Sequence, residues 1–242
     1  MKRFLALALT ILLVLSLAAC GEEKRTSKKD NTAATQAQTE PTNAIIGDPE
    51  RPTLAPSNPA TNSDEISFGD YSSTHYENEY FGFGVQVPND WTSDNIASLA
   101  SQCGTTEDKL LNDFENQLKD SQTTYTFKSI DNTTGNNVNI IIENLAKTNN
   151  SGISGKEYLE LVEGQLSSYY ESIGATDVEM EITTWDFNGV DFDTIEISCM
   201  LGDTELQQLQ IVAPAGDYMA VITFTVTDMD KFGYIDDYFY AV

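Results

Sequence analysis

The side chains in this sequence that could do chemistry are three cysteines, one histidine and a large number of carboxylates. A cysteine or serine nucleophile needs a base such as imidazole beside it, and protein zinc sites use several His or Cys ligands. His75 is the only histidine, and it lies at the junction between a polar linker and the region predicted to fold. A catalytic triad and a histidine-based zinc site are therefore not supported, which leaves the thiols and the carboxylates.

Cys20 ends an apolar N-terminal run that has the form of a secretion signal. Lys2 and Arg3 give the run a positive start, and residues 4–17 are almost wholly apolar. This length fits the roughly 7–15 apolar residues of a secretory signal and is shorter than the roughly 20 that span a bilayer.

The segment Leu17-Ala18-Ala19-Cys20 resembles the lipobox of bacterial lipoproteins in all four positions. The resemblance implies that diacylglycerol is attached to the Cys20 sulfur and that the chain is cleaved before it. Residues 1–19 are then a lipoprotein signal peptide, and acyl chains hold Cys20 in the lipid bilayer at about 0.8 kcal/mol per buried CH₂. We expect a lipid-anchored protein on the extracytoplasmic face of the cell membrane. The alternatives are an ordinary signal peptide ending near a cysteine and a retained transmembrane helix.

Cys103 and Cys199 remain once Cys20 is lipidated. Two cysteines outside the cytoplasm can form a disulfide, and they can equally be two buried thiols. Both interpretations remain open from the sequence.

Residues 20–74 are predicted to be the lipidated cysteine followed by a disordered tether. The segment is rich in Thr, Asn, Pro, Ala and Ser, and it holds five of the seven prolines. It has too few apolar residues to offset the entropy cost of ordering the chain. We expect one folded domain over residues 75–242.

The charge of the predicted domain limits the classes of molecule that can bind it. From Tyr76 onward the chain carries 29 carboxylates, six lysines and no arginine. Nucleic acid is excluded as a partner, because binding to phosphates needs a basic surface. A solvated acidic surface that keeps the protein soluble explains this charge, and a surface for a cation or a cationic partner is the alternative.

Several segments have the periodicity of strands and hairpins. Alternating apolar residues in "FGFGVQV" predict a half-buried strand over 81–87, ended by Pro88. A hairpin is expected where "TTYTFKSI" and "NVNIIIENL" flank "DNTTGN". Asn188-Gly189 predicts a type I′ hairpin between "VEMEITTW" and "DTIEISCML", and "PAGD" a tight turn between the next two strands.

Three helices are expected between these strands. The first covers Thr106 to Asp120, and the second runs from Gly155 to Ile173 after a capping box formed by Ser154 and Glu157. The last would occupy the C-terminal segment. Their predicted apolar stripes are Leu110, Leu111, Phe114 and Leu118; Tyr158, Leu161, Val162, Leu166 and Tyr169; and Phe232, Ile235 and Phe239.

Six or seven mostly antiparallel strands with interspersed helices predict an α+β layered domain. The pattern "Y-x-N-x-x-F-G-F-x-V-x-V-P-x-D-W" at Tyr76 to Trp91, with the later "NGVDF" and "GDYMAVITFTVTD", resembles the PsbP-like family, which includes DcrB-type bacterial lipoproteins. The resemblance implies an α-β-α sandwich with a central antiparallel sheet and helices on both faces. It also implies a binding or accessory module, and it carries over no catalytic residue.

Other candidate sites have structural explanations. Asp186, Asp191 and Asp193 cluster around the Asn188-Gly189 turn, and Asp131 begins "DNTTGNN". Their oxygens suit calcium, but neither spacing matches an EF-hand, so no metal is expected. No cofactor motif of the Walker, dinucleotide-binding or GxSxG type occurs. Three aromatic residues could line a groove or pack in the core: Trp91, Trp185 and Tyr238.

Two functions follow from these observations. The first is a membrane-anchored extracytoplasmic lipoprotein whose domain binds an envelope protein or ligand without catalysis. The second is a hydrolase that acts on envelope carbohydrate or peptide through paired carboxylates. A groove with two facing carboxylates whose pKa values are raised would favour the hydrolase, and a smooth sheet face covered by helices would favour the binding module.

Overall fold

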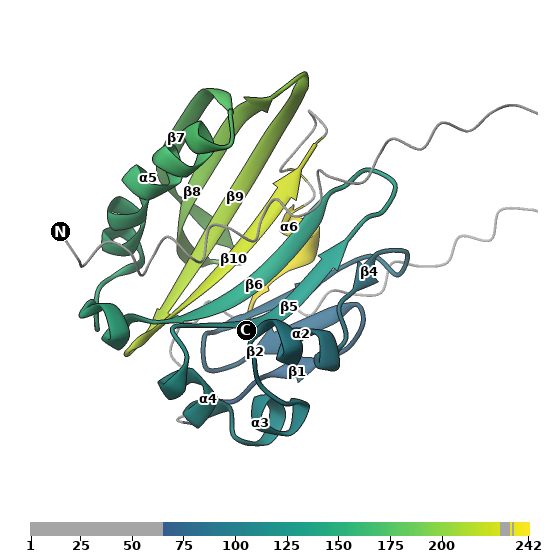
Figure 1. Ribbon diagram of the computed structural model, residues 1–242, viewed down its shortest axis with the longest axis vertical. Coiled ribbons are helices and arrows are strands. Elements are labelled where there is room, and N and C mark those ends of the chain that lie inside the picture. Colours follow the sequence, from purple (N-terminus) through teal and green to yellow (C-terminus); the bar gives the residue numbers. More distant parts are fainter. Residues whose placement is uncertain (1–64, 228–232, 234) are drawn as a thin grey trace, which may run out of the picture.

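The computed structural model describes residues 65–227, 233 and 235–242. Within this part of the chain, seven antiparallel strands form a central sheet in the order β4-β5-β6-β10-β9-β8-β7 (Figure 1). Its strands are β4 (Thr92–Ser93), β5 (Thr123–Ile130), β6 (Asn137–Asn144), β7 (Thr176–Phe187), β8 (Val190–Leu201), β9 (Thr204–Ala215) and β10 (Tyr218–Val226).

A second sheet of four short strands was not anticipated from the sequence. It has the order β1-β2-β3-β11 among the described residues. The strands are β1 (Asp70–Tyr71), β2 (His75–Asn78), β3 (Phe83–Gln86) and β11 (Phe239–Ala241). β11 pairs with β3, so the C-terminal strand completes a sheet that begins near the start of the described chain.

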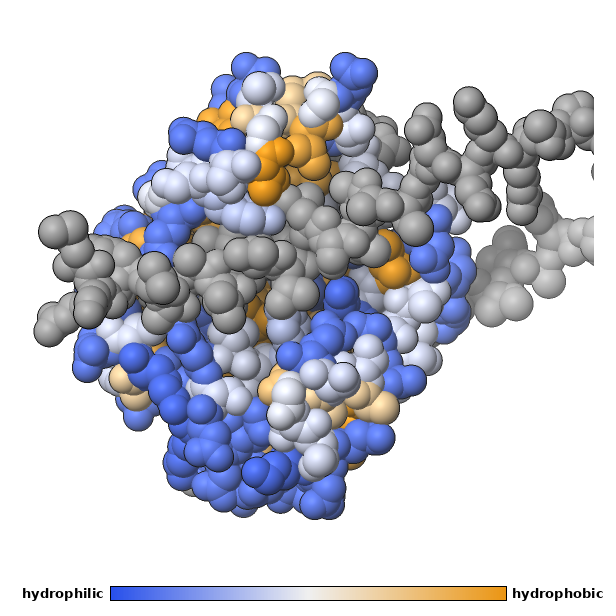
Figure 2. Space-filling model, in the orientation of Figure 1, coloured by the Kyte–Doolittle hydropathy of each residue, from blue (hydrophilic) through white to orange (hydrophobic). Residues whose placement is uncertain are grey.

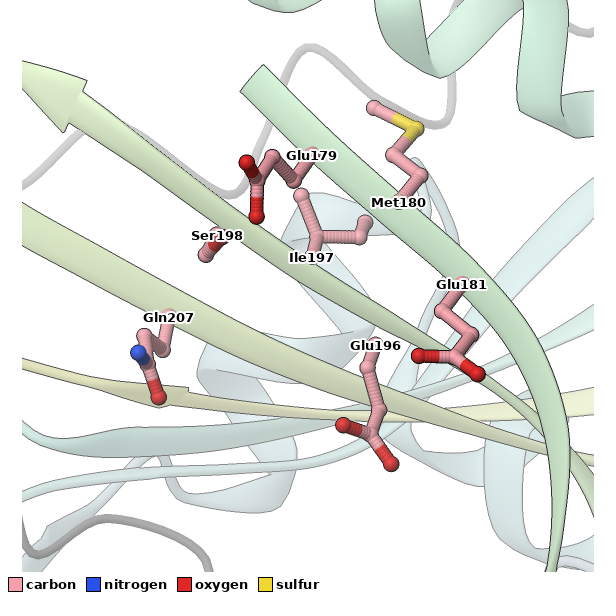
Figure 3. Close-up of a pocket in the computed structure, with 7 residues that line it drawn as sticks. All are labelled: Glu179, Met180, Glu181, Glu196, Ile197, Ser198 and Gln207. Carbon is pink, nitrogen blue, oxygen red and sulfur yellow. The ribbon is translucent and has the colours of Figure 1, made fainter. Parts of the chain in front are cut away.

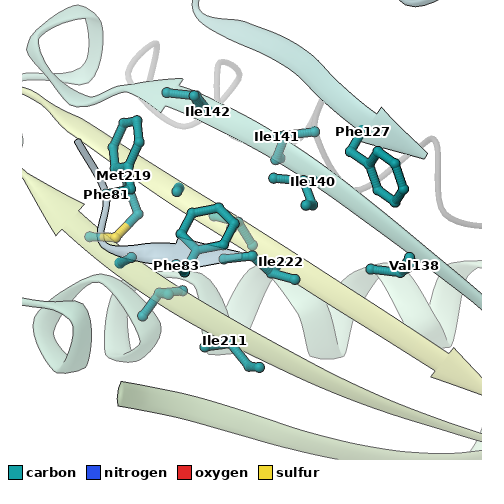
Figure 4. Close-up of a cluster of buried hydrophobic side chains, with 14 of the residues drawn as sticks. Phe81, Phe83, Phe127, Val138, Ile140, Ile141, Ile142, Ile211, Met219 and Ile222 are labelled. Carbon is teal, nitrogen blue, oxygen red and sulfur yellow. The ribbon is translucent and has the colours of Figure 1, made fainter. Parts of the chain in front are cut away.

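The two faces of the central sheet are covered differently. Helix α5 (Gly155–Ser172) lies over one face, where the hydroxyl of Tyr170 bonds to the side-chain oxygen of Gln208 in β9. On the other face Phe127 of β5 stacks on Tyr76 of β2, with ring centroids 6.0 Å apart. Figure 4 shows the same arrangement, with Phe83 over β9 and β10 and a helix behind them. The predicted α+β class with a central antiparallel sheet is confirmed.

Helix α5 begins at the predicted residue and ends one residue before the predicted end. The Ser154 hydroxyl accepts from the backbone N–H of Glu157, whose side chain accepts from the backbone N–H of Ser154. Gly174 follows the helix with a φ of 81°. The buried stripe differs in part, because Leu159 and Tyr170 are buried whereas Leu161 is 50% exposed.

The predicted hairpins are confirmed. β5 pairs with β6, β7 with β8 and β9 with β10. Asn188 and Gly189 have φ values of 59° and 87°, as a type I′ turn requires. In this hairpin Ile195 and Ile197 are fully buried, and Ile182 is half-buried.

We expect Gly189→Val to lower the free energy of unfolding by about 1–3 kcal/mol, because a β-branched residue is strained at this φ. Chemical denaturation of the two proteins would measure the change. Gly164→Ala is the control, because this exposed helix glycine has no positive φ and has open space around the added Cβ, so the substitution should not lower stability. Equal stability of wild type and Gly189→Val would contradict the turn assignment.

Two of the predicted helices are wrong in extent. The helix expected over 106–120 is broken at Asp113 into α3 (Glu107–Asn112) and α4 (Phe114–Asp120), and Leu111 is 45% exposed. The C-terminal helix is a single turn, α6 (Ile235–Tyr238). Phe239 belongs to β11 instead, and Phe232 lies outside the described residues. Two short helices were missed, α2 (Ile96–Gln102) and η1 (Leu145–Thr148).

Residues 65–74 are part of the packed structure, although the sequence analysis placed them in the tether. Tyr71 pairs with Tyr76 across β1 and β2, and Phe68 is 2% exposed. The folded region therefore begins before residue 75. Cys20 and most of the predicted tether lie outside the described residues. No helix in the described part of the chain is long and apolar enough to cross a membrane.

Candidate functional site

The second sheet covers only part of its face of the central sheet. Phe239 of β11 packs on Phe187 and Phe192 at one end of β7 and β8, with ring centroids 4.5 and 5.2 Å apart. Beyond this contact polar side chains of β7, β8 and β9 line the same face (Figure 3), and no described element covers them. We call this region the open acidic face; its members are Glu179, Glu181, Glu196, Ser198, Glu205 and Gln207.

The open acidic face contains a shallow hollow of about 440 Å³. Alternation places these side chains on one side, because Glu181 is directly opposite Glu196 and Glu179 is opposite Ser198. Ser198 is in turn opposite Gln207 of β9. The side-chain amide of Gln207 donates to a carboxylate oxygen of Glu205 at 3.0 Å.

Glu181 and Glu196 form a like-charge pair across two strands. Directly opposite residues have Cβ atoms about 5 Å apart, and equal charges at that separation destabilise a sheet. The indole N–H of Trp185 donates to Glu196 Oε1 at 2.8 Å and so holds that carboxylate in place. The arrangement is suited to a cationic group that lies between the two carboxylates.

The charge around the open acidic face has a single sign. Residues 176–215 include nine carboxylates and no lysine, arginine or histidine. On the side of the molecule seen in Figure 2, most of the described residues are hydrophilic and apolar side chains form only small groups. A partner of this region would thus be recognised by polar contacts and positive charge.

His75 lies inside β2, which differs from its predicted place at a domain junction. Its Nε2 is 2.7 Å from the hydroxyl of Tyr240, which donates to Glu77 Oε2, also at 2.7 Å. Because the hydroxyl proton points to Glu77, His75 Nε2 must be the donor to Tyr240. Burial, and secondly the bond to Glu77, raise the pKa of Tyr240. The Tyr240 ring covers Gly84, where an added Cβ would lie 2.2 Å from the ring.

The aspartates considered for calcium have structural partners. Asp193 Oδ2 accepts from the backbone N–H of Lys156 at 2.9 Å, so this carboxylate lies at the N-terminus of α5, where negative charge is favourable. Asp186 Oδ1 accepts from Gly189 in the hairpin turn. Asp191 is the cross-strand partner of Asp186.

Asp131 is held in the turn between β5 and β6. It accepts from the Thr133 backbone and the Thr134 hydroxyl, both at 2.7 Å, and these bonds lower the pKa of Asp131. Among the described residues, no group of three or more His, Cys, Asp and Glu side chains could hold a metal ion.

Cys103 and Cys199 are both free thiols. Cys103 Sγ accepts from the backbone N–H of Tyr125 in β5 at 3.2 Å, whereas Cys199 is buried in β8. Four strand spacings of about 4.8 Å separate β5 from β8, roughly 19 Å in all, which is far beyond the Cα separation of a disulfide. The structure favours two separate thiols, with Cys103 half-buried and Cys199 buried, and burial raises the pKa of each.

The aromatic candidates divide between packing and the open acidic face. Trp91 packs edge-to-face on Tyr238, with ring centroids 5.7 Å apart. Trp185 stacks on Phe187 and bonds to Glu196, so it borders the open acidic face. Glu181 and Glu196 were not predicted as a site from the sequence. The alternation in "VEMEITTW" and the position of the Asn188-Gly189 turn nevertheless determine that these two residues lie opposite each other.

Comparisons with known proteins find similarity at the level of structure only. The sequence matches no family model and no curated protein. The chain is similar to the solution structure of cyanobacterial PsbP (CyanoP) from Synechocystis sp. PCC 6803, with 13% identity and a TM-score of 0.40 over 72% of this chain and 96% of that one. It is also similar to a crystal structure from Bacteroides thetaiotaomicron VPI-5482, with 11% identity and a TM-score of 0.35 over 66% of this chain and 45% of that one. Membership of the PsbP-like family stays a prediction.

Proposed function

We propose that this protein is a lipid-anchored, extracytoplasmic binding module that holds a cationic partner on the open acidic face. The observation that carries this proposal is the facing pair of Glu181 and Glu196 on a part of the sheet that none of the described elements covers. A like-charge pair at this position weakens the sheet, and a positively charged partner would relieve the repulsion. The hollow is shallow and polar, which suits a binding surface better than a site that must exclude water from a reaction.

The anchoring part of the proposal is supported by the four lipobox positions that end at Cys20. We expect Cys20→Ala to abolish incorporation of labelled fatty acid and to release the protein from the membrane fraction, because the thiol is the only attachment point that the signal provides. Metabolic labelling and fractionation would measure both effects. Ser16→Ala, within the same signal, should leave labelling unchanged. Equal labelling of wild type and Cys20→Ala would contradict the anchor.

The binding part is tested by capture of surface proteins on the purified full-length protein. The combined change Glu179→Gln, Glu181→Gln and Glu196→Gln should remove the captured partner. A control with the same charge change on exposed helix positions, Glu107→Gln, Glu160→Gln and Glu163→Gln, should retain it. Equal capture by both variants would exclude the open acidic face as the binding surface.

A carboxylate-dependent hydrolase is the second candidate, and the facing pair of Glu181 and Glu196 is the observation that favours it. Such an enzyme would release reducing ends or free amines from isolated envelope polysaccharide or peptide, and either glutamate changed to glutamine would stop the release. We expect no release by the wild type. Release that depends on Glu181 and Glu196 would replace the binding proposal.

A further inference from the structure

β7 is an edge strand of the central sheet. It is 12 residues long and pairs only with β8 among the described strands. Edge strands present unpaired backbone N–H and C=O groups, and proteins commonly protect them by short length, proline, lysine or a bulge. β7 has no proline or lysine; its register with β8 shifts once, between Thr176 and Glu179 at the start of the strand, and the pairing is regular from Glu179 to Phe187.

The hairpin turn determines which backbone groups of β7 are free. In a hairpin closed by a two-residue turn, the flanking pair exchanges hydrogen bonds, and bonded and non-bonded pairs then alternate along the strands. Phe187 and Val190 flank the turn at Asn188-Gly189. The residues of β7 whose N–H and C=O groups point away from β8 are therefore Met180, Ile182, Thr184 and Asp186.

The charge on β7 selects among the possible occupants of this edge. A second copy of the chain, paired antiparallel through the same edge, would bring two acidic strands together; in the register centred on Met180, Glu179 of each copy lies opposite Glu181 of the other, and like charges directly opposite are destabilising. A basic extended chain would instead bring positive side chains beside these carboxylates, which is favourable. Along such a chain every second side chain would reach over the open acidic face, beside Glu179, Glu181 and Glu196.

We propose that the outer edge of β7 binds an extended, lysine- and arginine-rich polypeptide segment by strand addition. This inference rests on the proposed binding function and names the class of partner and the way it pairs. The backbone groups of Met180, Ile182, Thr184 and Asp186 supply the hydrogen bonds, and the open acidic face selects positive side chains. The acidic side chains also protect the empty edge from pairing with another copy.

Thr184→Pro is a direct test of the edge. Thr184 is exposed, and its N–H points away from β8, so proline removes a free donor while the pairing of β7 with β8 remains. The probe is a fluorescent ten-residue peptide of alternating lysine and valine, titrated by anisotropy onto the full-length lipidated protein in neutral detergent. We expect the peptide to bind at least about tenfold more weakly to Thr184→Pro, because a hydrogen bond is lost and the ring obstructs the incoming strand.

Thr184→Ala is the matched control, because it removes the same side chain and retains the N–H. It should bind the peptide as wild type does, and Thr184→Pro and wild type should have the same melting temperature within a few degrees. Equal affinity of Thr184→Pro and Thr184→Ala would overturn strand addition. A peptide N-methylated at its valines has the same charge but cannot pair through the edge that places its lysines over the open acidic face, and it should bind about tenfold more weakly to the wild type.

Amide hydrogen exchange of the wild type gives a readout without any substitution. Peptide binding should slow exchange at Met180, Ile182 and Asp186, whose N–H groups face outward, and leave the exchange of Gly104 unchanged. Unchanged exchange at these three positions in the presence of bound peptide would overturn strand addition. If Glu179→Gln, Glu181→Gln and Glu196→Gln together abolish peptide binding while Thr184→Pro does not, the proposed binding face stands and strand addition fails. A peptide that binds the charge-changed protein and the wild type equally counts against both.

Discussion

Phe68→Ala is expected to lower the free energy of unfolding by about 3–5 kcal/mol, the usual range for removing a buried phenylalanine. Phe68 is 2% exposed, although it lies in a segment with the composition of a linker. Its ring packs edge-to-face on Phe114 of α4 and Tyr76 of β2, with centroids 5.5 and 6.0 Å away. The side chain thus fills the space between the second sheet and the α3–α4 segment.

The backbone around Phe68 is held as firmly as its ring. The Tyr76 hydroxyl donates to the Phe68 carbonyl at 2.8 Å, and the Asn78 side-chain amide donates to the Ser67 carbonyl at 3.1 Å. Burial raises the pKa of Tyr76 to about 12, so this hydroxyl stays a donor at neutral pH. A chain that starts at residue 75 would leave these buried groups without their partners.

Urea denaturation of wild type, Phe68→Ala and Leu111→Ala would measure the effect. Leu111 is 45% exposed on α3, so its substitution should change the free energy of unfolding by less than about 1 kcal/mol. A chain beginning at residue 65 should keep the stability of the full chain, whereas one beginning at residue 75 should lose about as much as Phe68→Ala. Equal stability of the two truncated chains would show that the segment is not part of the fold.

The burial of Phe68 could not be predicted from the residues next to it in the sequence. Ser72, Ser73 and Thr74 separate it from β2 and give the segment a polar composition that is typical of linkers. Phe68 is buried by Tyr71, Tyr76 and Phe114 on three different elements, and Phe114 is more than 40 residues away in sequence. Where the pairing was local, as in the β7–β8 hairpin with its Asn188-Gly189 turn, the strands and their register were predictable.

The helix predicted for the C-terminal segment was wrong for a related reason. Ile235 and Phe239 are spaced as on a helix, and both are buried, but the chain leaves the helix at Tyr238. Phe239 to Ala241 then pair with β3 over Val85, Gly84 and Phe83, a partner more than 150 residues away in sequence. Short apolar segments fit a helix turn and a strand equally well, and only the long-range pairing decides.

Part of the candidate site could be predicted from the sequence. Alternation along β7 and β8 places Glu179, Glu181 and Glu196 on one face once the turn is fixed. What the sequence does not contain is which part of that face stays open. The second sheet determines it, because Phe239 covers the end near Phe187 and, within the part of the chain that the structure describes, no element covers the glutamates.

Phe239→Ala is expected to lower the free energy of unfolding by about 3–5 kcal/mol, as large-to-small changes at buried aromatic positions do. Phe239 is 1% exposed, and its ring lies 4.5 Å from that of Phe187, 5.2 Å from that of Phe192 and 5.8 Å from that of Phe83. It is the side chain through which β11 and the second sheet contact the β7–β8 hairpin. The loss should therefore loosen the second sheet from this end of the central sheet.

Two neighbouring substitutions separate packing from the other roles of β11. Phe239→Leu keeps most of the apolar volume and should cost less than Phe239→Ala. Tyr240→Phe removes the hydroxyl that joins His75 to Glu77 but keeps the ring over Gly84, so it should cost about 0.5–1.5 kcal/mol. Urea denaturation would rank the three proteins, and amide exchange in β2 and β3 should accelerate most in Phe239→Ala. A cost for Phe239→Ala no greater than that for Tyr240→Phe would mean that the contact between the sheets contributes little, and that the hydrogen-bonded surface of β2, β3 and β11 holds the C-terminal strand in place.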